Sequence, residues 1–97
     1  MSDSTYDWGE RVFAPPVGSF DVEWVSRGVE RSTGLAFQDA VRLVADLWWR
    51  AREEGSTDVD VLVAGGWEEH VPLSAVRIAA RLVEEYCRAY DVDPAAR

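Results

Sequence analysis

The sequence holds few side chains that could carry out covalent or metal chemistry. It has one histidine, His70, and one cysteine, Cys87, and their separation of 17 residues matches no zinc-binding pattern. A serine–histidine–aspartate set could be assembled from Ser32, His70 and Asp60, but no local signature of an activated nucleophile accompanies them. We therefore expect no catalytic residue, no metal site and no cofactor, and we expect a protein that is not an enzyme.

Two charged residues are unusual in their predicted positions. Arg31 and Glu69 both fall on the apolar faces of predicted hairpins and are the candidate buried charges of the sequence. An inward charge is costly unless it is paired. They could pair with each other, protect the sheet edges, or, for Arg31, lie over the ring of Trp24. A ligand-binding pair is the functional alternative.

Trp49 is the candidate functional residue of the chain. On a helical wheel it lies outside the apolar arc, beside Arg42, Gln38 and Glu53. Exposed tryptophans are common anchors of protein interfaces, so Trp49 and Arg42 are candidate partner-binding residues. The alternative is that an aromatic N-terminal arm covers the ring.

That arm comprises residues 1–18 and carries Tyr6, Trp8 and Phe13 among glycines and prolines that disfavour regular structure. The three aromatic residues are also candidate partner contacts. Either the arm docks on its own domain or it binds a partner. The arm has neither the basic nor the apolar region of a secretory signal.

The charge balance restricts the classes of partner. Eighteen acidic residues and ten basic ones give a net charge of −8, and the sequence has no apolar run long enough to cross a bilayer. An anionic phosphate backbone or membrane surface would be repelled, so we expect neither nucleic acid nor membrane as a partner. A basic protein partner fits the charge. The single cysteine is compatible with the reducing cytoplasm, where we expect the protein to be located.

The elements predicted around these residues are two hairpins and two helices. Residues 20–24 alternate apolar and polar residues, and a turn at 26–29 would pair them with the following strand. Residues 58–63 predict a second strand, paired with residues 67–73. Apolar stripes at helical spacing predict helices near 39–54 and 74–90.

The N-caps expected for these helices are Asp39 and Ser74, and Gly55 is expected to end the first one. Val44 and Ala79 lie at the centres of the two apolar stripes. The helical segments 40–47 and 75–82 also match each other at five of eight positions, which suggests an internal repeat.

Together these elements predict an α+β fold made of two ββα repeats. Its mainly antiparallel four-stranded sheet would be covered on one face by both helices. The domain would span residues 19–91, between the arm and a C-terminal tail at 92–97. We expect a homodimer formed through sheet edges or the side that carries Trp49.

The leading functional hypothesis is a small acidic protein-interaction module. A specific version is an inhibitor or immunity-type protein that masks a basic partner, since charge complementarity accelerates association. The alternative is a small-ligand-binding or regulatory domain with a pocket between helices and sheet. An enzyme with an active site at a dimer interface is the third class.

Overall fold

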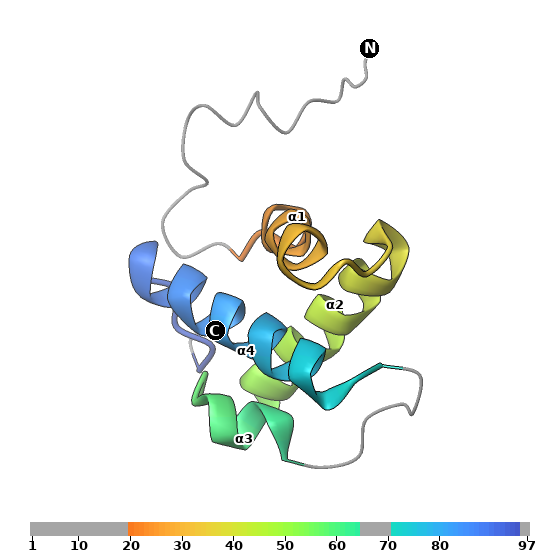
Figure 1. The fold of residues 1–97 in the computed structure, drawn as a ribbon. Coiled ribbons are helices and arrows are strands. Elements are labelled where there is room, and N and C mark those ends of the chain that lie inside the picture. The colour runs from red at the N-terminus through yellow and green to blue at the C-terminus, as the bar shows by residue number, and fades with distance from the viewer. Residues whose placement is uncertain (1–19, 65–70, 96–97) are drawn as a thin grey trace.

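The computed structural model describes residues 20–64 and 71–95, and these residues form a bundle of four helices (Figure 1). In chain order the helices are α1 (Val22–Thr33), α2 (Phe37–Glu54), α3 (Val59–Val63) and α4 (Leu73–Ala89). The long helices α2 and α4 pack together, α1 lies across them, and α3 packs against them on the opposite side (Figure 1). The described residues contain no β-strand, so the predicted α+β fold with its four-stranded sheet is wrong.

Helix α1 occupies the segment predicted to be the first hairpin. Asp21 caps its start, because the Oδ1 atom of this residue accepts a hydrogen bond from the backbone N–H of Trp24 at 3.0 Å. Gly34 caps its end in the left-handed conformation, with φ of 80°. The turn predicted at 26–29 therefore lies inside a helix.

The inner face of α1 explains why the helix forms. Val22, Val25, Ser26 and Val29 follow the i, i+3, i+4, i+7 spacing of one helical face. Three of them are buried, and the hydroxyl of Ser26 donates a hydrogen bond to the carbonyl oxygen of Val22 at 2.7 Å. The alternation of residues 20–24 is short enough to be compatible with either a strand or a helix. In this protein the helical face supplies the apolar surface that the core buries.

Helix α3 replaces the strand predicted at 58–63. The carboxylate of Asp58 accepts a hydrogen bond from the backbone N–H of Asp60 at 2.8 Å and caps this short helix. Its Leu62 side chain is completely buried. Most of the partner strand predicted at 67–73 lies outside the described residues, and Leu73 begins α4. The prediction of two ββα repeats is therefore also wrong.

The two long helices agree with the sequence pattern. The helices predicted near 39–54 and 74–90 are observed as α2 and α4, and the matched segments 40–47 and 75–82 lie within them. Long amphipathic stretches with a consistent helical period identify helices more reliably than short apolar runs do. The similarity of the two segments reflects two helices with the same apolar period.

The N-terminal caps of α2 and α4 differ from the residues predicted for them. The N-caps are Ala36 and Pro72, which lie before the expected Asp39 and Ser74. Neither Ala36 nor Pro72 makes a side-chain capping bond. Asp39 instead lies in the first turn of α2, where a carboxylate interacts favourably with the helix dipole. Gly55 ends α2 in the left-handed conformation, as predicted.

One apolar core joins all four helices. It is built from buried aliphatic side chains together with Tyr86 and Cys87, and its completely buried members include Val29, Val44, Leu47, Leu62, Val76, Ala79 and Val83. Trp24 and Trp48 pack against it from its edge. Val92, in the expected C-terminal tail, is also buried, and its N–H donates a hydrogen bond to the carbonyl oxygen of Cys87. The core therefore extends past the end of α4.

Candidate functional site

The candidate catalytic and metal-binding residues do not form a site within the described part of the chain. Ser32 is exposed on α1 and Asp60 is exposed on α3, and these two helices lie on opposite sides of the bundle (Figure 1). His70 and Glu69 lie outside the described residues. Among the residues that the structure describes, no group of three or more histidine, cysteine, aspartate or glutamate side chains could hold a metal ion.

The thiol of Cys87 is buried on the inner side of α4. Burial raises its pKa from an ordinary value of 9.0 to about 11, with a further contribution from the negative charge of Asp93. A thiol with so high a pKa is protonated at neutral pH and is a poor nucleophile. Cys87 is therefore a core residue.

Trp49 lies on the outer face of α2, with 67% of its surface exposed. Its neighbour Trp48 points the other way and packs against the core. The outer face also carries exposed polar side chains, among them Gln38, Arg42, Asp46, Arg52 and Glu53. The structure thus brings Trp49 and Arg42 to one surface. The other candidate partner-binding residues, Tyr6, Trp8 and Phe13, lie outside the described residues.

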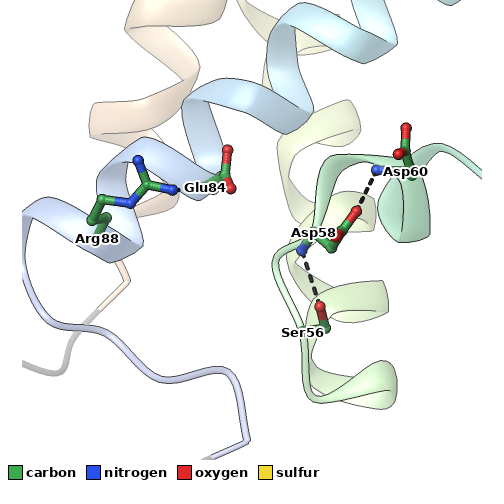
Figure 2. A network of polar contacts seen from close by, with 5 residues as sticks. All are labelled: Ser56, Asp58, Asp60, Glu84 and Arg88. Atoms are coloured by element: carbon green, nitrogen blue, oxygen red, sulfur yellow. Dashed lines mark hydrogen bonds and ion pairs between the residues drawn. The ribbon is translucent and has the colours of Figure 1, made fainter.

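Exposed carboxylates gather where α2 ends and α3 begins. Glu53, Glu54, Asp58 and Asp60 are all exposed there. The backbone N–H of Asp58 also donates a hydrogen bond to the Ser56 hydroxyl, at 3.0 Å (Figure 2), so hydrogen bonds order this turn. This end of the molecule is therefore acidic.

On the neighbouring helix α4, the carboxylate of Glu84 forms an ion pair with Arg88, at 3.2 Å (Figure 2). This pair is the i, i+4 contact expected from the helical spacing. It satisfies the charge of Arg88 within its own helix. Arg88 is thus engaged on α4 by Glu84.

Arg31 is exposed on α1, so the prediction of a buried charge at this position is wrong. The prediction placed it on the inner face of a strand, whereas the helix turns it away from Val25 and Val29. The side chain instead lines a groove between α1 and α4 with a volume of about 240 Å³. Glu85 of α4 lines the same groove.

Aromatic and aliphatic side chains form most of the groove. Its lining comprises Trp24, Val25, Gly28 and Arg31 from α1, and Leu82, Glu85, Tyr86 and Tyr90 from the α4 side. The rings of Tyr86 and Tyr90 lie 4.7 Å apart. Gly28 deepens the groove, because a Cβ atom there would lie 3.6 Å from Cδ1 of Leu82. The groove therefore combines apolar walls with one cation and one anion.

This groove is the feature that the sequence analysis missed. Trp24, Gly28 and Arg31 have the i, i+4, i+7 spacing of one helical face, which was a visible signal. The hairpin assignment separated them, because it placed Gly28 in a turn and Arg31 in the returning strand. A helix with Asp21 as N-cap would have placed the three on one surface.

Comparisons with known proteins identify no relative. No family model, no curated protein and no solved structure matches the chain. Among the described helices, none is both long enough and apolar enough to span a membrane.

Proposed function

We propose that this chain is a non-enzymatic protein-interaction module and that Trp49 anchors its partner. The observation that carries the proposal is the exposure of this indole, 67% of which faces solvent on a helix whose other face is buried. Tryptophan is enriched among the residues that dominate binding energy at protein interfaces. A surface helix gains little stability from a tryptophan on its solvent side, so a binding role accounts for the residue better.

The charges around Trp49 support a partner with basic groups. Asp46 and Glu53 lie three residues before and four residues after it, and both are exposed. Beyond Glu53 the helix leads to the carboxylates of Glu54 and Asp58. These exposed carboxylates outnumber the two exposed arginines of the same surface, Arg42 and Arg52, and with the net charge of −8 they would attract a cationic protein and orient it as it approaches.

The specific version of this proposal is an inhibitor or immunity-type protein that covers a basic surface of a toxin or nuclease. Small acidic proteins suit this task because complementary charge raises association rates. The single buried thiol suits a reducing compartment, and we place the protein in the cytoplasm.

Site-specific photo-crosslinking in the native host tests the proposal. A photoreactive residue at position 42 or 53 should yield one defined adduct, and the same residue in place of Arg77, on the exposed side of α4, should not. Identical adducts from all three positions, or none from 42 and 53, would contradict the proposed surface.

The captured partner then permits a quantitative test. Trp49→Ala should weaken its binding about 30-fold, which corresponds to about 2 kcal/mol, without changing the melting temperature. Leu73→Ala is the matched control, because Leu73 is also apolar and 56% exposed but lies on α4. Equal affinities of the parent and Trp49→Ala proteins would refute the anchoring role.

The alternative function, small-ligand binding, is supported by the groove between α1 and α4. Its volume of about 240 Å³ could hold a small organic molecule between Trp24, Tyr86 and Tyr90. The groove lies between two helices, not between helices and a sheet as the predicted fold implied. A ligand that binds there should protect the Trp24 side chain and leave Trp49 accessible, as measured by chemical labelling of tryptophan.

A further inference from the structure

A mainly apolar stripe continues from the groove along the outer side of α4. Ile78, Leu82, Glu85 and Ala89 follow one another at i, i+4, i+7 and i+11, the spacing of a single helical face. Ile78 is 38% exposed and Ala89 is exposed, while Leu82 is half-buried where it lines the groove. The groove and this stripe together form a larger surface, which we call the α1/α4 face.

Two opposite charges stand on this face, one on each helix. Arg31 projects from α1 and Glu85 from α4, and both side chains are exposed. Within the described part of the chain neither forms an ion pair, with the other or with any other residue. By contrast, Arg88 and Glu84, on the same helix as Glu85, are paired. The α1/α4 face thus carries one positive and one negative group, each without a partner among the described residues.

We propose that the α1/α4 face binds a second copy of this chain in a twofold-symmetric dimer. In such a dimer the same surface is used twice, so any residue that contacts a second residue across the axis is contacted in the same way in return. Arg31 of each protomer pairs with Glu85 of the partner subunit, which gives two equivalent ion pairs around an apolar centre. A face with one cation, one anion and apolar walls is complementary to itself.

Charge complementarity favours a second copy over another partner. A uniformly basic partner would satisfy Glu85 but would place like charge against Arg31, which is costly at an interface. In a dimer of two copies, Arg31 and Glu85 each meet a group of opposite charge. The α1/α4 groove is also lined by one cation and one anion in a chain with a net charge of −8, so contact between two such grooves adds no net like charge.

The proposed dimer interface is a different surface from the one around Trp49 that we propose binds the partner. Trp49 lies on α2, outside the α1/α4 face, and its exposed side would stay accessible in the dimer. The dimer would present two copies of the Trp49 surface. The two proposals can therefore fail separately: loss of the dimer does not remove the anchor, and Trp49→Ala should not alter the oligomeric state.

Charge exchange tests the dimer directly. Sedimentation equilibrium of the full chain at tens of micromolar should give the dimer mass. Arg31→Glu and Glu85→Arg should each raise the dissociation constant roughly tenfold or more, because each places like charges opposite one another twice. Mixing the two variants in equal amounts should restore a dimer, since the two introduced charges then face each other across the interface and the retained Arg31 faces the retained Glu85. The double variant should dimerise by itself.

Matched controls separate this pairing from general charge effects. Arg77→Glu and Glu54→Arg make the same changes of charge at exposed positions outside the face, and both should leave the parent mass unchanged. Circular dichroism confirms that every variant is folded. A monomeric parent, or single variants that dimerise as the parent does, would overturn the proposal. A mixture that stays monomeric would overturn it as well.

Discussion

The ring of Phe20 stacks flat on the indole of Trp48, with centroids 4.2 Å apart and planes 5° apart. The ring of Tyr86 also meets Phe20, edge-on at 5.2 Å. These three rings join the start of α1 to α2 and α4. Aromatic pairs in this geometry add to the free energy of burial, so the contact fixes where the chain enters the bundle.

The two adjacent tryptophans of α2 should respond differently to truncation. Trp48→Ala removes the stacked ring and a packed part of the core edge, and should lower the free energy of unfolding by roughly 2–3 kcal/mol. Trp49→Ala removes an exposed ring and should change it by less than about 0.5 kcal/mol. Urea denaturation followed by circular dichroism measures both. Equal losses would mean that α2 is rotated relative to the arrangement described.

Gly28→Ala should stabilise the protein. Gly28 lies in the interior of α1, where glycine is less favourable than alanine by about 0.5–1 kcal/mol. The added Cβ would lie 3.6 Å from Leu82, an ordinary van der Waals contact. We expect a gain of that size in urea denaturation at matched protein concentration. The hairpin prediction implies the reverse, because a turn glycine with positive φ would resist the change.

Val44→Asp should unfold or strongly destabilise the chain. Val44 is completely buried at the centre of α2, so the substitution places an unpaired carboxylate in the core at a cost of several kcal/mol. Gln38→Asp is the control, at an exposed position of the same helix, and should change stability by less than about 0.5 kcal/mol. A parent-like thermal midpoint for Val44→Asp would contradict the core assignment.

The pKa of Cys87 predicts a loss of stability at high pH. In the unfolded chain the thiol ionises near 9.0, whereas in the folded protein its pKa is about 11. Between these values the unfolded state binds fewer protons, so the contribution of Cys87 is complete below pH 9 and disappears as the pH approaches 11. This contribution of Cys87 to the free energy of unfolding is on the order of 2 kcal/mol.

Comparison with Cys87→Ala isolates this effect from the titration of other groups. Urea unfolding at about pH 7, 9 and 10.5 should show a steeper fall for the parent than for the variant. Parallel pH profiles would mean that the thiol is solvated in the folded state.

Some local features of the chain could be read from its residues. The helices α2 and α4 were predicted because their apolar residues keep the helical period over several turns, and Val44 and Ala79 were correctly placed in the core. Gly55 ended α2 as expected, since glycine adopts the left-handed conformation without strain. The outward position of Trp49 follows from the same wheel.

The short segments were assigned incorrectly because their local pattern is ambiguous. Residues 20–24 alternate as a strand does, yet Val22, Val25 and Val29 also line one face of a helix. Residues 58–63 are too few to show a helical period. In both segments the apolar side chains find the core as helices packed on α2 and α4, and that packing outweighs local preference.

Residue type and local spacing are enough to predict the two long amphipathic helices, the positions that form their buried stripes and the acidic character of the surface. Tertiary packing, by contrast, determines that α1 and α3 are helices. It also determines that α1 lies against α4, with Arg31 and Glu85 on opposite sides of one groove. The physical reason is that these two residues are far apart in the chain, and their meeting depends on which helical faces the common core buries.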